Sequence, residues 1–329
     1  MLYSLAMTPS TLASLVASMA VVTGCGAVSD PGTGGPSDAG VVSRPVEVVM
    51  FTHIEDSTPA GTLGSAQCQI AYQAIRGRLV EVAERARAHG LQWVVQPDWK
   101  ILEAALLHED ASLTATTAGK NVFAYLHEDL GVTIDPHSHE NGGYNYADVA
   151  YLLGELGVGG STVIGGHIWD PALPQFQQWD RFRAPVGGLK YPTASWGGNI
   201  LIGAGTPNHV NDPLISGAWR PLDRDHYFDH DPAGNIIAFG AWVDEVAGVE
   251  ELVARRGDGT VSDAVMLTAA WNIGPRQFSS ATGPDEVDAA VFSPIAALRD
   301  QGLIDVTDFT KLAALWQSSY GGIAGTYTR

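Results

Sequence analysis

Residues 46–52 (VEVVMFT) form a short apolar run rich in β-branched side chains, and residues 53–57 (HIEDS) follow it directly. The run predicts a buried β-strand, and the polar residues predict a loop at the carboxyl end of that strand. In parallel sheets, functional groups gather at this end of the strands. The segment that opens the fold is therefore also expected to supply the first candidate site residues.

Helical and extended patterns alternate after this strand. Residues 69–89 have helical spacing, ended by Gly90, with apolar side chains near one face at Ile70, Ala74, Ile75, Leu79, Val82 and Ala86. Further helices are expected over residues 100–107, 119–130 and 146–156, and extended segments over 91–95, 132–137 and 161–165. This alternation is typical of βα units, so we expect one α/β domain over residues 46–329, built on a mainly parallel sheet.

The residues before this domain have the features of an export segment and a tether. The apolar run over residues 12–22 is too short to span a bilayer and fits the apolar region of a signal peptide. Residues 22–25 (VTGC) resemble the lipobox of bacterial lipoproteins, which implies cleavage and lipidation at Cys25. Residues 26–45 are rich in Gly, Ser, Pro and Asp and predict a flexible linker. We expect an exported protein, lipid-anchored at the cell envelope or secreted.

The net charge limits the classes of binding partner, and the cysteine count limits the disulfide content. The formal net charge is −18, which repels nucleic acid and anionic lipid, so membrane contact is expected only through the lipid anchor. The chain has two cysteines, too few for a disulfide framework. With Cys25 in the lipobox, Cys68 is expected to be a lone buried thiol.

Residues 135–141 (DPHSHEN) carry the strongest candidate site. Side chains alternate along an extended segment, so His137 and His139 point the same way and their imidazoles can converge on one ion. Two imidazoles, a carboxylate and a water make the open arrangement of a catalytic zinc. The alternative is that both histidines form hydrogen bonds at the rim of the sheet. Of the adjacent acids Glu55 and Asp56, one can ligate the metal while the other accepts a proton from the bound water.

Other side chains at strand ends are expected to line the same site. His53 shares the face of Glu55 on an extended strand and is a candidate ligand, acid or base. Further candidates for the pocket wall and for substrate binding come from strand ends and loops: Asp98, Glu140, His167, Trp169, Asp170 and Trp219. Tryptophan faces stack on sugar rings, although most tryptophans are large core residues.

These motifs together resemble the polysaccharide deacetylases. The first family motif, Thr-Phe-Asp-Asp-Gly, corresponds to residues 54–57 (IEDS), the second, a His-Ser/Thr followed by a further His, to residues 137–139 (HSH), and the third to residues 219–222 (WRPL). The motifs span residues 46–223, and the closing pattern agrees: helix 294–298, extended 302–306 and helix 308–316. The resemblance implies an irregular (β/α) barrel in a single domain, and removal of N- or O-acetyl groups from a polysaccharide.

The resemblance also implies roles. A divalent cation, zinc, would bind Asp56, His137 and His139, Glu55 would act as base, and Arg220 would orient that carboxylate. The family usually places its second histidine further on, where this chain has Asn141. Glu55 replaces the first aspartate, and residues 265–272 (VMLTAAWN), where the family has a strand ending in histidine, contain none. The general acid is therefore unassigned, with His53 and His167 as candidates.

Two further functions remain open. The same barrel would serve a glycoside hydrolase that uses paired carboxylates, such as Glu55 with Glu140 or Asp170, without an obligatory metal. A barrel without its general acid would serve as a non-catalytic, glycan-binding lipoprotein. The sequence names neither the glycan nor the oligomeric state.

Overall fold

The strand β1 (Val46–Ile54) lies at the centre of the first sheet and is buried along its whole length. The computed structural model describes residues 43–55, 58–166, 174–204, 213–242 and 245–329. Contacts within residues 43–329 make this part of the chain one compact unit. The lipobox with Cys25 and residues 26–42 of the expected linker lie outside the described residues.

The first sheet is parallel and is organised around β1. Strand β10 (Thr268–Asn272) pairs with one edge of β1. The other edge pairs first with β11 (Ile304–Val306) and then with β2 (Val94–Pro97), which in turn pairs with β3 (Thr133–Ile134). The first strand therefore takes two of its three partners from the end of the chain.

The second sheet mixes both strand directions. Its order is β12-β8-β9-β7-β4, in which β4, β7 and β9 are parallel and β8 and β12 run antiparallel to their neighbours. The bounds of these strands are β4 (Val163–Ile164), β7 (Ile200–Ala204), β8 (Ile215–Trp219), β9 (Ile237–Gly240) and β12 (Gly325–Thr328). A two-stranded ribbon joins β5 (Val186–Gly187) to β6 (Ser195–Trp196).

Backbone contacts join the two sheets on two sides. His137, just after β3, forms a parallel bridge with Gly165, just after β4. On the other side, the Ala270 N–H of β10 donates to the Ala241 carbonyl, next to β9, at 2.7 Å. The structure thus confirms an α/β fold with a mainly parallel sheet, and it assigns the strands to two sheets joined by these links.

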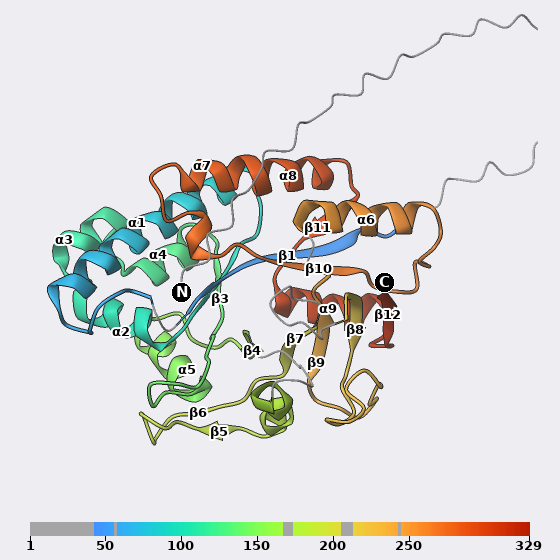
Figure 1. The fold of residues 1–329 in the computed structure, drawn as a ribbon, viewed down its shortest axis with the longest axis horizontal. Coiled ribbons are helices and arrows are strands. Elements are labelled where there is room, and N and C mark those ends of the chain that lie inside the picture. Colours follow the sequence, from blue (N-terminus) through green and yellow to red (C-terminus); the bar gives the residue numbers. More distant parts are fainter. Residues whose placement is uncertain (1–42, 56–57, 167–173, 205–212, 243–244) are drawn as a thin grey trace, which may run out of the picture. The chain divides into compact units, whose positions relative to one another are not determined.

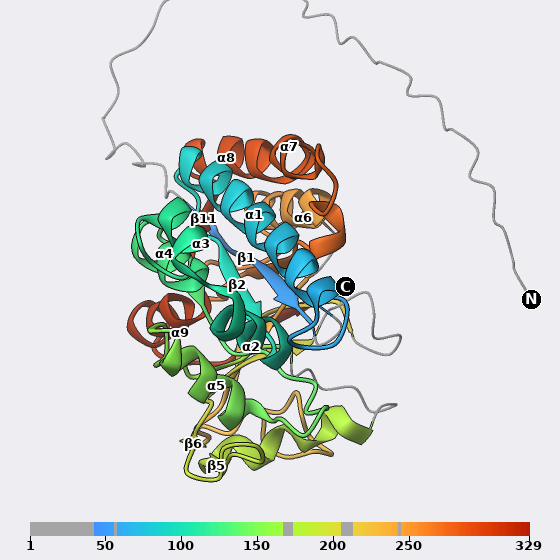
Figure 2. The ribbon, with the colours of Figure 1, turned by 90° about the vertical axis from the view of Figure 1, so that its left-hand side faces the viewer.

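Helices cover the outer face of the first sheet. In Figures 1 and 2, α1, α6, α7 and α8 lie above β1, and the second sheet with α9 lies below it. The α-helices are α1 (Ala66–Ala88), α2 (Trp99–His108), α3 (Ala111–Thr114), α4 (Val122–Glu128), α5 (Tyr146–Glu155), α6 (Glu245–Gly257), α7 (Gly283–Val287), α8 (Ser293–Asp300) and α9 (Phe309–Ser319). Shorter helical segments are η1 (Ala115–Thr117), η2 (Pro174–Arg183), η3 (Pro275–Gln277) and η4 (Asp288–Phe292).

The alternation of side chains along β1 separates two parts of the core. Val48 and Met50 pack with α1 in the larger cluster, whereas Val49 and Phe51 pack with β7, β9 and α9 in a second cluster. Side chains two residues apart on a strand share a face. His53 therefore lies on the face of Val49 and Phe51, between the two sheets.

The buried face of α1 differs from the predicted one. Ser65 caps the helix by accepting from the Cys68 N–H, and the helix begins before the predicted residue 69. Cys68 is buried, as expected. Ile70, however, is 69% exposed and Ala74 is exposed, whereas Arg76 is buried in their place. Arg76 is tolerated there because it pairs with the buried Glu109 at 2.9 Å.

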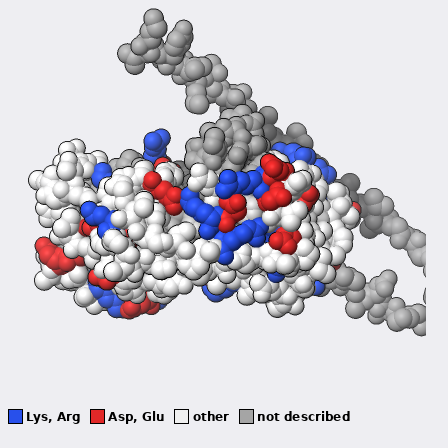
Figure 3. All heavy atoms as spheres, turned by 90° about the horizontal axis from the view of Figure 1, so that it is seen from below, with Lys and Arg blue, Asp and Glu red and all other residues white. Residues whose placement is uncertain are grey.

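The acidic excess does not produce a uniformly negative surface. Figure 3 shows one face on which basic and acidic side chains lie next to each other near the middle. Exposed ion pairs such as Arg224 with Asp180, at 2.9 Å, are consistent with this mixing. Within the described ranges, no helix has both the length and the hydropathy needed to cross a bilayer.

Candidate active site

Three histidine rings lie together at the carboxyl ends of β1 and β3. The ring centroids of His53 and His137 are 4.2 Å apart, and those of His137 and His139 are 4.8 Å apart. His53 and His137 are buried, whereas His139 is exposed. The sequence prediction that His137 and His139 lie close together is therefore supported, and His53 joins them.

His53 reaches this cluster from the interior face of β1. Its ring packs on Phe51, with centroids 4.8 Å apart, and its backbone N–H donates to Asn272 Oδ1 at 3.4 Å. Burial, with a smaller contribution from His139 nearby, lowers the pKa of His53 to about 3. Its imidazole is neutral at physiological pH as a result, and the buried Nε2 has no hydrogen-bond partner in the described part of the chain.

His137 is held by the backbone around it. Its N–H donates to the Pro97 carbonyl at 3.2 Å, and its bridge to Gly165 joins the two sheets. Burial lowers the pKa of His137 well below its usual value, and His53 contributes to that shift. Both ring nitrogens are buried without a hydrogen-bond partner in the described segments. A buried polar atom of this kind is costly unless a ligand completes it.

A glycine closes over the His137 ring. Gly166 has a φ of +74°, in the left-handed region that favours glycine. A Cβ atom there would lie 2.2 Å from His137 Cε1. Any other residue would displace the imidazole, so this glycine sets the position of the ring.

A cavity of about 300 Å³ opens next to this cluster. It is lined by His53, Glu55, Thr58, Asn272 and Arg276, among others. Glu55 is exposed and comes one residue after the end of β1. The cavity combines a carboxylate, an imidazole, an amide and a guanidinium. Such a set can orient a polar substrate and transfer a proton.

Glu140 is a further charged residue next to the histidine cluster and follows His139 directly in the chain. Its φ is +53°, and its carboxylate forms an ion pair of 2.5 Å with Arg181 of η2. Burial raises the pKa of Glu140, and Arg181 opposes that rise. The role of Glu140 in substrate binding stays a prediction.

The structure does not bring Arg220 together with Glu55. Trp219 pairs with Ala238, the second residue of β9, so Arg220 lies beside the amino end of a strand that is parallel to β7. Glu55 lies at the opposite, carboxyl end of its strand. The Arg220 guanidinium stacks on the Trp316 ring at 4.8 Å. The predicted role in orienting Glu55 is therefore corrected to one in packing.

Trp219 is also placed away from any substrate. It is 1% exposed, and its indole N–H donates to the Tyr227 carbonyl at 2.8 Å. A ring without an exposed face cannot stack on a sugar. The predicted contact with substrate is therefore corrected to a core position.

Four other predicted site residues lie outside the described residues. These are Asp56 as a metal ligand, His167 as a possible acid, and Trp169 and Asp170 as substrate-binding residues. Asp98 is described. Its side chain caps α2 by accepting from the Trp99 N–H at 2.6 Å, and its own N–H donates to the Ile54 carbonyl.

Sequence reasoning missed three residues next to the histidines. Asn272 ends β10, beside Phe51, at the position where the family motif predicts a histidine. Gln96 is fully buried opposite His53 in the pairing of β1 with β2. Gly165 approaches so closely that a Cβ atom there would lie 2.7 Å from Gln96 Oε1. A polar residue inside an apolar strand was the available signal for Gln96.

The donor set fits a metal ion in chemistry, although not as a complete site. Imidazole nitrogens are common zinc ligands, and the buried nitrogens of His53 and His137 have no other partner in the described part of the chain. The described residues contain no group of three or more His, Cys, Asp or Glu side chains that could hold a metal. The expected carboxylate ligand, Asp56, lies outside them.

Comparisons with known proteins add little. No protein-family model matches the sequence, and no curated protein matches it. A solved structure, the 4-alpha-glucanotransferase from Thermococcus litoralis, is similar with a TM-score of 0.46 and 9% identity, over 82% of this chain and 40% of that one. The chain thus spans about two fifths of the length of that structure. A likeness at this level carries no argument about activity.

Proposed function

We propose that this protein is a metal-dependent hydrolase that removes acyl groups from carbohydrate, on an irregular (β/α) barrel of the polysaccharide deacetylase type. One observation carries the proposal: three imidazoles lie together at the carboxyl ends of parallel strands, and the buried ring nitrogens Nε2 of His53 and Nδ1 and Nε2 of His137 have no hydrogen-bond partner in the described residues. The links between the two sheets, at His137 and at Ala270, support the barrel.

In this proposal, His137 and His139 hold a divalent cation, zinc, together with Asp56. When bound, the cation polarises the acyl carbonyl and lowers the pKa of a water. Glu55 lines the cavity and accepts the proton of the attacking water. His53 borders the same cavity, next to Asn272 where the family has its late histidine, and its neutral imidazole accepts a hydrogen bond from the substrate instead of donating a proton. Glu55 passes the proton that it took from water to the leaving oxygen or nitrogen.

The remaining groups position the substrate. Arg276 lines the cavity and has no carboxylate partner among the described residues, so it is available to polar groups of the sugar. Gly166 fixes the ring of His137, which keeps the reacting geometry within a narrow range.

Metal content tests the proposal most directly. Purified wild-type protein is expected to contain about one equivalent of a transition metal by elemental analysis, and His137→Ala is expected to lose it. His127→Ala is a matched control because His127 is exposed and bonds only the nearby Val132 carbonyl. Equal, negligible metal in all three proteins after zinc loading and desalting would refute the metal site.

A glycoside hydrolase is the second candidate. It is favoured by one observation, the raised pKa of Glu140, which suits a proton donor. Release of reducing sugar that survives a chelator and is lost in Glu140→Gln would select this function. Loss of acyl release with the chelator, and its recovery with zinc, would select the deacylase.

We also propose that the protein is exported and lipidated at Cys25, on the strength of residues 22–25. Metabolic labelling with a fatty-acid analogue should mark the wild type and not Cys25→Ser. Equal labelling of both would contradict lipidation at this residue.

A further inference from the structure

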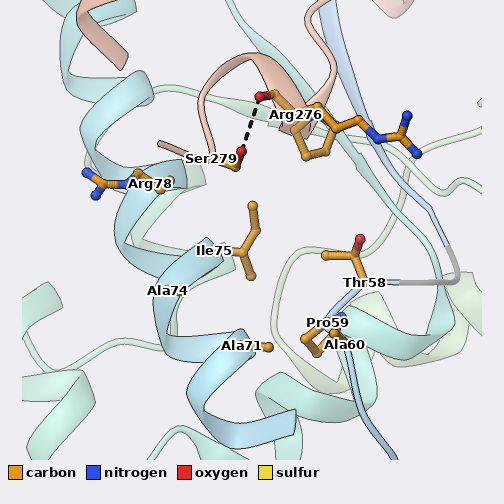
Figure 4. Close-up of a pocket in the computed structure, with 10 residues that line it drawn as sticks. Thr58, Pro59, Ala60, Ala71, Ala74, Ile75, Arg78, Arg276 and Ser279 are labelled. Carbon is orange, nitrogen blue, oxygen red and sulfur yellow. Dashed lines mark hydrogen bonds between the residues drawn. The ribbon is translucent and has the colours of Figure 1, made fainter. Parts of the chain in front are cut away.

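A second cavity, of about 340 Å³, adjoins the cavity of the candidate active site. The two share Thr58, Pro275 and Arg276 as lining residues. In Figure 4, the Arg276 guanidinium points away from α1, and Thr58 lies between Pro59 and the end of β1. The second cavity thus continues from the cavity of His53 and Glu55 toward α1.

The walls of this second cavity are apolar. One wall is α1, which contributes Ala71, Ala74 and Ile75, and another is the loop with Pro59 and Ala60. Figure 4 shows the Ile75 side chain pointing into the space between helix and loop. We refer to the space between these five residues as the apolar trench.

Two polar side chains at the edge of the trench, Ser279 and Arg78, are already engaged. The Ser279 hydroxyl donates to the Arg276 carbonyl at 3.1 Å, as drawn in Figure 4. The Arg78 guanidinium points away from the trench in the same view and pairs with Glu81 at 2.5 Å. A ligand in the trench would therefore contact mainly carbon atoms and would form few hydrogen bonds.

α1 also exposes an apolar side chain that does not line the trench. Ile70 lies one turn before Ala74 on the same row of the helix and is 69% exposed. Among the described residues no aromatic ring lines the trench, whereas sugar-binding surfaces rely on aromatic faces and polar contacts. A narrow space with alanine and proline walls suits an aliphatic chain better than a sugar ring.

We propose that the trench binds the acyl chain of the substrate, and that this chain is longer than acetyl. The inference rests on the proposed deacylase function. Water adds to the acyl carbonyl in the polar cavity, and the bond from the carbonyl carbon to the sugar oxygen or nitrogen breaks. The sugar leaves with a proton on that atom, and the fatty acid leaves along the trench.

Chain-length preference tests this inference. We would measure kcat/KM for 4-nitrophenyl acetate and 4-nitrophenyl octanoate, for which the octanoate adds six methylenes. Full burial of one methylene raises binding, and with it kcat/KM, about fourfold. Even partial burial of the six methylenes therefore predicts a kcat/KM for octanoate that is roughly tenfold or more above that for acetate. Ala74→Phe should fill the trench and reduce this ratio to about one through a loss of kcat/KM for octanoate.

Gln73→Phe is the matched control. It adds the same side chain at an exposed neighbouring position on α1 that does not line the trench. This variant is expected to keep the octanoate preference. A ratio near one in the wild type, or a preference that persists in Ala74→Phe, would overturn the inference.

A binding measurement separates this inference from the proposed function. Calorimetric titration of His137→Ala with N-octanoylglucosamine and N-acetylglucosamine needs no turnover. At least tenfold tighter binding of the octanoyl sugar supports the trench even if no ester is cleaved, in which case the hydrolase proposal fails. If esters are cleaved but neither the kinetic assay nor the binding assay shows a preference for octanoyl over acetyl, the hydrolase proposal stands and the proposed binding of an acyl chain in the trench is refuted.

Discussion

Glu47 is a buried carboxyl group at the amino end of β1, and it should make the stability of the protein depend on pH. It is 3% exposed and lines a cavity of about 280 Å³ with Asp305, its partner in the pairing of β1 with β11. Burial, with a smaller contribution from the nearby Asp305 carboxylate, raises its pKa from 4.5 to about 8. The protonated form is therefore favoured in the folded state.

The sign and size of the effect follow from this shift. The folded-state pKa lies above the unfolded value, so the contribution of Glu47 is complete below about pH 4.5 and is lost as the pH rises toward 8. Because each pKa unit corresponds to about 1.4 kcal/mol, this carboxyl alone should lower the free energy of unfolding by about 3 kcal/mol between pH 4.5 and pH 7. By pH 9 the loss should reach about 5 kcal/mol.

The substitution Glu47→Gln removes the charge and keeps the shape. Urea unfolding at several pH values between 4.5 and 9, followed by tryptophan fluorescence, would give the free energy of unfolding of each protein. The variant should gain about 3 kcal/mol relative to the wild type as the pH rises from 4.5 to 7. Glu84→Gln, at an exposed position on α1, is the control and should follow the wild type. Parallel curves for Glu47→Gln and the wild type would refute the reasoning.

Two further predictions concern packing around the site and in the helical layer. Gly166→Ala should destabilise the fold by roughly 2–4 kcal/mol and displace His137, because the added Cβ would lie 2.2 Å from that ring. Thermal melting would measure the loss of stability, and metal content would report the displaced ring. An unchanged melting temperature would contradict this prediction. Arg76→Met should cost about 3–5 kcal/mol in urea unfolding because it leaves the Glu109 carboxylate buried, whereas Arg78→Ala, with its partly exposed ion pair, should cost less than about 1 kcal/mol.

The sequence predicts the strands best where burial is continuous. Strand β1 is buried on both faces, so its run of apolar residues identified it, and the polar residues at its end indicated the site. The close approach of His137 and His139 followed from the alternation of side chains along one segment. Local periodicity was sufficient for these features.

The orientation of α1 could not be predicted in this way. Hydrophobicity favoured a face with Ile70 and Ala74, yet the buried face contains Arg76, whose charge is neutralised by Glu109 thirty-three residues further on. The position of Arg220 was missed for a similar reason. Strand β8 runs antiparallel to β9, which reverses the end of the sheet at which its last residues lie. Both errors come from contacts between distant segments.

The pairing of β1 has a consequence for how the chain reaches its native state. Thr52 donates to the Ile273 carbonyl, 221 residues further on, and β11 pairs with β1 from beyond residue 300. Contacts of such long range close slowly, and the first strand lacks two of its three partners until nearly the whole polypeptide is available. During synthesis, the hydrophobic opening segment therefore stays exposed to chaperones and proteases until the last fifth of the molecule emerges.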